Sequence, residues 1–157
     1  MTNGPSRRRL LLQAGLAGGL QLAVTGGLAL VAAPARACEF FASTLRVTHP
    51  WTRATGDDDT TAIVCMRFDE VRVDERLIGI ETPLATGAEL GGARAGQRLV
   101  VDIPRDRETL LSEHGTFIRL TGLLTPLEVG RAYPMNLLFA VAGPLRAELT
   151  VDYARFR

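Results

Sequence analysis

Short runs of strand-forming residues, separated by turn residues, are the feature that most constrains how this 157-residue chain can fold. Residues 60–68 are rich in β-branched side chains and apolar on both faces, which is typical of a central strand. Residues 145–153 alternate between apolar and polar side chains, a period of two that indicates a strand with one buried face. Further short strands are predicted at residues 76–82, 99–103, 109–111, 117–120 and 133–141. No amphipathic helix of useful length appears, so we expect an all-β sandwich or barrel.

A targeting segment is predicted before this domain. Three arginines at positions 7–9 precede an uncharged stretch at residues 10–35, and residues 35–37 read Ala-Arg-Ala. These parts are typical of a signal peptide, and the consecutive arginines resemble the twin-arginine type. A membrane anchor is the alternative, because 26 uncharged residues could span a bilayer. Glycines and glutamines weaken such a span, so we predict cleavage after Ala37 and export to the periplasm of a bacterium.

The chain then divides into residues 1–37, a twin-arginine-type signal peptide, and residues 38–157, one β domain without a stable membrane span. Without the first segment, 14 of the 18 basic residues remain against 17 acidic ones, a net charge near −3. This balance offers no basic face for nucleic acid, so no nucleic-acid partner is predicted. The sequence also lacks G-x-S-x-G, H-E-x-x-H and phosphate-loop motifs, so we do not predict an enzyme.

The two cysteines, Cys38 and Cys65, leave two interpretations open. In an exported protein a pair of cysteines is first interpreted as a disulfide, which stabilises by about 2–4 kcal/mol. The alternative is lipid attachment at Cys38, because this residue directly follows the predicted cleavage site. Lipoprotein signals usually carry a larger aliphatic residue where this chain has Ala35, and for that reason we predict the Cys38–Cys65 disulfide.

Several segments, taken in order, resemble one known family. They are residues 47–53 (VTHPWTR), 81–85 (ETPLA), 88–90 (AEL), 101–104 (VDIP) and 120–130 (LTGLLTPLEVG). This order resembles the periplasmic copper chaperone family written PCu(A)C, over roughly residues 45–151. The Trp-x-Arg opening and the Gly-Leu-x-x-Pro-Leu-x-x-Gly segment are the most specific parts. The resemblance implies a cupredoxin-like Greek-key β-sandwich, and a role in delivering Cu(I) towards an exported copper enzyme such as cytochrome oxidase.

The resemblance also implies where copper ligands would stand. The family uses two His and two Met: a His after the Glu-Leu pair, Met in the following loop, and a His-x-Met pair before Leu-x-Gly-Leu. Here Gly91 follows Glu-Leu, the loop at residues 92–97 contains no Met, and Phe117-Ile118-Arg119 replaces the His-x-Met pair. A phenyl ring has no donor atom and a guanidinium is a permanent cation. We therefore expect the fold to be kept and the metal site at Gly91, Phe117 and Arg119 to be lost.

Other donor residues are assigned by their setting. His114, in the turn before Phe117, is the fallback metal ligand if a copper site has been rebuilt. His49 is expected to pack against Trp51, and Arg53 to stack on the same indole. Two methionines, Met66 and Met135, lie in apolar strands, where packing in the core is the expected role.

Phe117 and Arg119 are two residues apart on a predicted strand and therefore face the same way. Together with Arg94, Arg98 or Arg105 they would form an apolar and cationic patch suited to a protein partner or an anionic ligand. The alternative is that Phe117 completes the core and Arg119 is merely exposed.

Three functional hypotheses follow. The first is an exported, copper-chaperone-like accessory in periplasmic copper handling or oxidase assembly, whose partner is a copper protein or an oxidase assembly factor. The second is a working Cu(I) carrier with a site rebuilt around His114. The third is a partner-binding β-sandwich that uses no metal. Copper(I) is the one cofactor that the resemblance implies.

Overall fold

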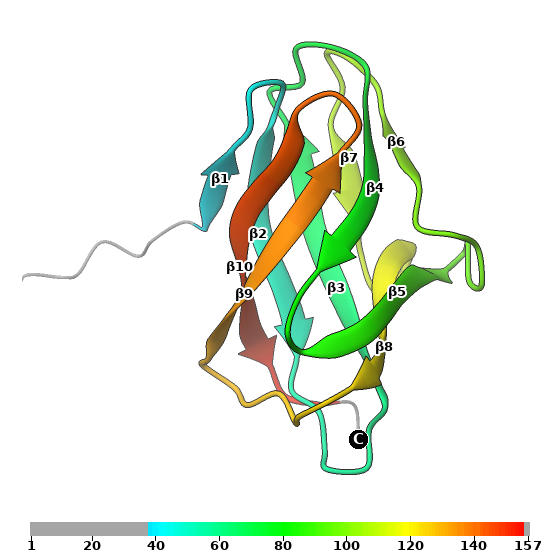
Figure 1. The fold of residues 1–157 in the computed structure, drawn as a ribbon, viewed down its shortest axis with the longest axis vertical. Coiled ribbons are helices and arrows are strands. Elements are labelled where there is room, and N and C mark those ends of the chain that lie inside the picture. The colour runs from blue at the N-terminus through cyan, green and yellow to red at the C-terminus, as the bar shows by residue number, and fades with distance from the viewer. Residues whose placement is uncertain (1–37, 156–157) are drawn as a thin grey trace, which may run out of the picture. The chain divides into compact units, whose positions relative to one another are not determined.

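The computed structural model describes residues 38–155, so the predicted signal peptide lies outside the described residues. Ten strands and no helix make up this part of the chain (Figure 1). The strands are β1 (Glu39–Phe41), β2 (Arg46–Arg53), β3 (Thr61–Asp69), β4 (Glu75–Glu81), β5 (Ala85–Gly92), β6 (Val101–Ile103), β7 (Thr109–Leu111), β8 (Thr116–Leu123), β9 (Ala132–Phe139) and β10 (Gly143–Tyr153). Within residues 38–155, no helix could cross a membrane by length and hydropathy. The predicted all-β fold class is confirmed.

The strands form one curled sheet in the order β5-β8-β3-β2-β10-β9-β4-β6, with β1 added to β2 and β7 added to β3. Among the described strands β2 and β10 pair in parallel, and the other pairs are antiparallel. The sheet curls round on itself (Figure 1), and its buried side chains form one hydrophobic core cluster. Strand β3 is an interior strand with β8 and β2 as its neighbours, in agreement with the central position predicted for residues 60–68.

Buried side chains from both ends of the sheet meet in the core. Leu90 of β5 and Ile118 of β8 belong to the same cluster as Leu137 of β9, and all three are fully buried. Burial of one such side chain stabilises the fold by about 1.5–3 kcal/mol. The predicted alternation of β10 is confirmed, because Ala147, Leu149 and Val151 are buried while Arg146, Glu148 and Asp152 are exposed. Met66 and Met135 lie in this core, as predicted.

Sequence reasoning missed β2 as a strand, and the local geometry explains why. Pro50 lies inside β2, and proline within a run of residues argues against a strand. The pairing of β2 with β3 shifts between Thr48 and Trp51, which marks a bulge. His49 within this bulge has a φ of 50°, in the left-handed region. The strand is therefore interrupted locally and held by its neighbours rather than by its own propensity.

Glu75 is a charged residue buried among the strand ends, with an exposure of 3%. Its carboxylate accepts hydrogen bonds from the backbone N–H groups of Arg76, Val141 and Ala142 at 2.8–2.9 Å. The Thr44 hydroxyl donates a fourth bond at 2.9 Å. Burial by itself would raise the pKa of Glu75, but these four bonds outweigh it and lower the pKa. One carboxylate thus ties the β1–β2 loop and the β9–β10 turn to the start of β4.

Candidate functional site

Strands β5 and β8 carry the positions at which the copper site was expected to be lost. They are antiparallel neighbours, with Gly91 opposite Phe117 and Glu89 opposite Arg119. Cβ positions that are directly opposite lie roughly 4.5–5.5 Å apart. The structure therefore brings Gly91, Phe117 and Arg119 into one small area.

The phenyl ring of Phe117 fills the space above Gly91. A Cβ atom on Gly91 would collide with the ring, whose Cδ2 and Cζ atoms would lie only 2.7 Å from it. Gly92 has a φ of +66°, and a Cβ atom there would collide with the carbonyl oxygen of Gly115. An aromatic ring over a cross-strand glycine covers backbone that would otherwise be open. Hydrocarbon thus occupies the place where the resemblance implied an imidazole.

Arg119 forms an ion pair across the same two strands. Its Nη1 donates to Oε1 of Glu89 at 3.2 Å, and both side chains are partly exposed. A pair at this exposure stabilises the fold by at most about 1 kcal/mol. Its chemical effect is larger, because it fixes a permanent cation where the resemblance implied a thioether.

His114 lies in the turn between β7 and β8 and is 92% exposed. Its Nε2 is 3.6 Å from Oε1 of Glu113. That carboxylate is already held by Arg53, whose Nε and Nη2 donate at 2.8 and 3.0 Å and lower the pKa of Glu113. Within residues 38–155, no three His, Cys, Asp or Glu side chains are arranged to hold a metal ion. A rebuilt copper site around His114 therefore gains no support from this geometry.

Phe117 and Arg119 line the same surface cleft, which has a volume of about 410 Å³. Arg53 and Arg155 are the arginines that line it with them, in place of the expected Arg94, Arg98 or Arg105. Arg94 bonds instead to Gln97 and to the Val100 carbonyl, and Arg105 bonds to Asp106. Phe117 is partly exposed, contributes to this cleft and does not belong to the core cluster.

The aromatic residues beside the cleft are arranged differently from the expectation. Arg53 lies over the ring of Tyr153, 5.2 Å from its centroid, and does not stack on Trp51 as predicted. Trp51 contacts Tyr153 edge-on, at 4.7 Å between centroids. His49 turns to Asp152 rather than to the indole, with Nε2 at 3.2 Å from Oδ2. The contacts of Tyr153 with Arg53 and Trp51 were not predicted, because it is about a hundred residues away from both of these partners.

Cys38 and Cys65 lie on opposite sides of β2. Residues 46–48 of β2 pair with β1 along one edge and with β3 along the other. Two strand spacings, about 9–10 Å, therefore separate the strand that follows Cys38 from the strand of Cys65. Disulfide-linked Cα atoms are usually about 4.4–6.8 Å apart. In the structure Cys65 is fully buried and is not bonded to Cys38.

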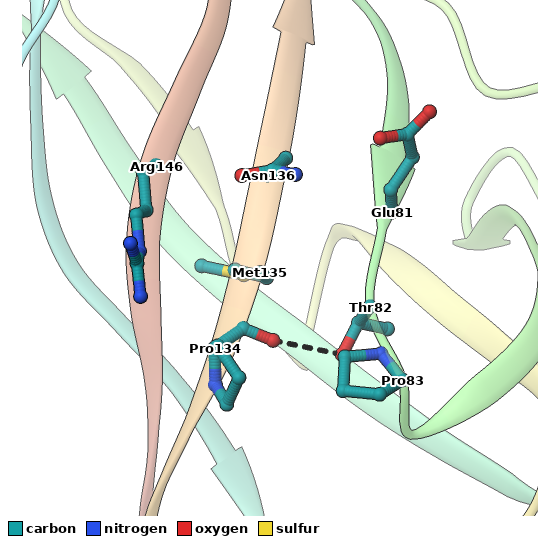
Figure 2. A pocket seen from close by; sticks show the side chains of 7 residues that line it. All are labelled: Glu81, Thr82, Pro83, Pro134, Met135, Asn136 and Arg146. Carbon is teal, nitrogen blue, oxygen red and sulfur yellow. Dashed lines mark hydrogen bonds between the residues drawn. The ribbon is translucent and has the colours of Figure 1, made fainter.

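Another hollow lies on the outer face of β4, β9 and β10 (Figure 2). Glu81, Asn136 and Arg146 form one row across the three strands, because Asn136 is opposite Glu81 on one side and opposite Arg146 on the other. Met135 also lines this hollow, but it is 2% exposed and belongs to the core. The hollow therefore offers polar side chains without a soft metal donor within reach of solvent.

Comparison with known proteins identifies the fold and the family. Residues 45–151 match the family described as "LpqE-like: Putative lipoprotein LpqE-like". No curated protein matches the chain. Among solved structures, the copper-bound PCuAC domain from PmoF2 is 22% identical with a TM-score of 0.68, covering 73% of this chain and 97% of that chain. The apo PCuAC domain from PmoF1 is 24% identical with a TM-score of 0.68, covering 73% and 98%.

A third similar structure is CuI-DR1885 from Deinococcus radiodurans, which is 25% identical with a TM-score of 0.56 and covers 66% of this chain and 75% of that chain. Likeness at this level of identity concerns the fold. The resemblance to PCu(A)C proteins that the sequence indicated is therefore confirmed for the architecture. The chain belongs to the LpqE-like family, and its β domain has the fold of PCuAC domains.

Proposed function

We propose that this protein is an exported, copper-chaperone-like accessory that acts in copper handling or oxidase assembly outside the cytoplasm. Its LpqE-like membership and its likeness to a copper-bound PCuAC domain and to CuI-DR1885 support the link to copper. The predicted signal peptide supports export to the periplasm. The protein acts by binding a partner rather than by catalysing a reaction.

One observation carries the proposal that copper is not held at the family positions. The ring of Phe117 lies over Gly91, and Arg119 is paired with Glu89. Neither side chain on β8 has a lone pair for a soft cation, and the guanidinium repels one. A metal ion at this place would need both residues to be replaced.

The cleft beside these residues is the surface proposed for the partner. Arg53, Arg119 and Arg155 line it together with one acidic residue, Asp59, while Ile63 and Phe117 contribute apolar area. Arginine and aromatic residues are enriched at protein interfaces. An acidic, partly apolar segment of a copper protein or an oxidase assembly factor fits this combination.

The loss of the family site is tested by restoring its donors. We compare the full chain with the triple variant Gly91→His, Phe117→His, Arg119→Met in a Cu(I) competition titration. Removal of the ring frees the space above residue 91, so we expect the triple variant to bind one Cu(I) more than the unchanged chain. If substitution of Phe117 or Arg119 made Cu(I) binding weaker than that of the unchanged chain, the proposal would be contradicted.

The partner surface is tested in cells that lack the native gene. We expect Phe117→Ala with Arg119→Glu to lower the copper loading of an exported oxidase as much as deletion of the gene. Arg105→Glu, on a distant loop, makes the same change of charge and should leave loading intact. Normal loading by the cleft variant, at equal protein level, would remove this surface from the proposal.

A further inference from the structure

A second set of donor side chains lies beside β1 and β2, away from the β5–β8 positions. The N–H of His49 donates to the carbonyl of Cys38 at 2.7 Å. Glu39 is opposite Thr48 at the end of the β1–β2 ladder, and this hydrogen bond continues the pairing by one residue on each strand. The sequence order places Cys38 and His49 11 positions apart, and the ladder makes them neighbours.

The backbone at His49 directs its imidazole out of the sheet. The bulge in β2 and the φ of 50° turn the residue away from the regular strand, and its side chain is 56% exposed. Nε2 then meets Oδ2 of Asp152 at 3.2 Å, and the hydroxyl of Thr150 donates to the same oxygen at 3.1 Å. A carboxylate on one ring nitrogen fixes the tautomer and leaves the other nitrogen, Nδ1, as a donor for a metal.

Cys38 and His49 line one pocket, which has a volume of about 430 Å³. Trp51 and Leu110 also line it. The carboxylates of Asp152 and Glu148 lie within electrostatic reach of the Cys38 thiol. Thiolate and imidazole are donor types that select copper(I) over hard cations.

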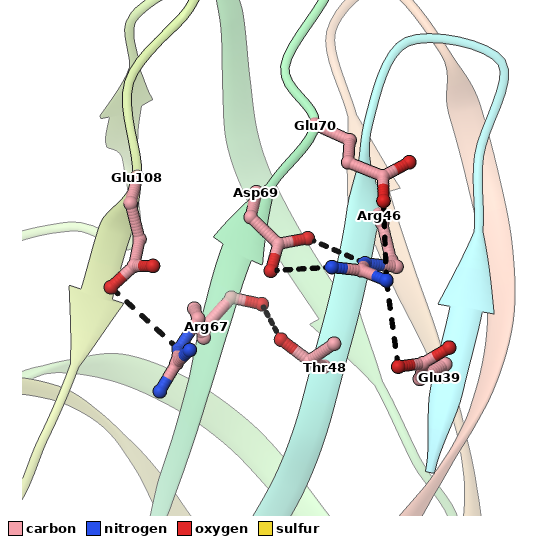
Figure 3. A network of polar contacts seen from close by, with 7 residues as sticks. All are labelled: Glu39, Arg46, Thr48, Arg67, Asp69, Glu70 and Glu108. Carbon is pink, nitrogen blue, oxygen red and sulfur yellow. Dashed lines mark hydrogen bonds and ion pairs between the residues drawn. The ribbon is translucent and has the colours of Figure 1, made fainter. Parts of the chain in front are cut away.

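Arg46, which also lines the pocket, does not oppose a bound cation because carboxylates surround it (Figure 3). Its guanidinium donates to Asp69 through Nε at 2.7 Å and through Nη2 at 3.1 Å. Nη1 lies 3.1 Å from Glu70 and 3.5 Å from Glu39. This network holds the start of β2 against β1 and β3, and so supports the backbone on which His49 depends.

We propose that Sγ of Cys38 and Nδ1 of His49 bind one Cu(I) ion, with Asp152 as a positioning residue for the imidazole. On binding, the thiol releases its proton to solvent and the sulfur forms a bond to copper, whose oxidation state does not change. Two protein donors suit Cu(I), whereas a structural Zn²⁺ site normally has four. The remaining coordination positions face the pocket and are open to a donor from a partner. This site is independent of the cleft at Phe117.

The test is a Cu(I) titration of the full chain, purified without oxygen, against the chromophoric chelator bicinchoninate. We expect the unchanged chain to take up one Cu(I) ion and to show the ultraviolet thiolate-to-copper absorption. Cys38→Ser should abolish both signals, and His49→Ala should weaken binding strongly. Asp152→Asn should weaken it by about 10- to 100-fold, the usual effect of losing a carboxylate behind a histidine ligand.

His114→Ala is the matched control, because it removes the other histidine while leaving the pocket intact. Circular dichroism establishes that each variant is folded. Equal Cu(I) uptake by the unchanged chain and by the double variant with Cys38→Ser and His49→Ala would overturn the proposal. Loss of uptake in the single variant His114→Ala would overturn it too. A lipid found on Cys38 by intact mass of the protein from its host would also overturn it, since a thioether-linked lipid consumes the thiolate. None of these outcomes affects the partner surface at Phe117.

Discussion

Phe117 packs its phenyl ring over Gly91, its direct partner across the β5–β8 ladder. The two residues are complementary in size, since the ring uses the space that a side chain on residue 91 would need. Each residue alone could be a chance replacement in a sequence. Their contact shows that the two positions are packed against each other as a unit.

This contact predicts a coupling between the two positions. Gly91→Ala should destabilise the unchanged protein by about 1–3 kcal/mol, because overpacking displaces the ring. In a Phe117→Ala background the same change should be nearly neutral. The four free energies of unfolding, measured in urea, form a double-mutant cycle. Additive effects would mean that the ring does not depend on the glycine.

The hydrogen bonds to the buried carboxylate of Glu75 predict that replacing only a few of its atoms will strongly destabilise the protein. Glu75→Gln keeps the shape but replaces one acceptor oxygen by an N–H₂ donor, leaving buried N–H or O–H donors without a partner. We expect a loss of about 3 kcal/mol in the free energy of unfolding. Glu81→Gln, on the exposed end of the same strand, is the control and should change stability by less than about 0.5 kcal/mol. A similar effect for both variants would contradict the role assigned to the buried carboxylate.

The lowered pKa values of Glu75 and Glu113 predict acid sensitivity. Both carboxyl groups hold their charge more strongly in the folded than in the unfolded chain. Their stabilising contribution is therefore present above the ordinary glutamate pKa of about 4.3 and is lost as the pH falls through the lowered folded-state values. Urea unfolding at a series of pH values should show stability falling below about pH 4.5. Glu75→Gln should flatten this fall, and an unchanged slope in that variant would exclude Glu75 as its source.

Cys65 is predicted to be inert in the folded protein. Burial, with a smaller effect from the nearby Glu113, raises the pKa of Cys65 to about 12, so the reactive thiolate is scarce at neutral pH. Iodoacetamide should leave Cys65 unmodified in the native protein and should modify it in urea without any reductant, as read by peptide mass mapping. If Cys65 in urea reacted with iodoacetamide only after reduction, it would be part of a disulfide.

The sequence alone determined the chemistry of individual positions. Residue identity is enough to establish that Gly91, Phe117 and Arg119 offer no donor atom for copper. The period of two in residues 145–153 was enough to predict which side chains of β10 are buried, because strand side chains alternate between faces. The all-β class followed from the same short-range signals. Strands β2 and β5 escaped prediction because Pro50 and several glycines oppose local strand propensity.

The tertiary structure decided which of these positions are neighbours. It placed Arg53 and Arg155 beside Phe117, set β2 between the two cysteines, and brought Val141 to a carboxylate 66 residues away in the sequence. It also joined Cys38 to His49 through the β1–β2 ladder. Strand order and register depend on the burial of one shared core by all the strands together, and no local pattern in the sequence carries that information.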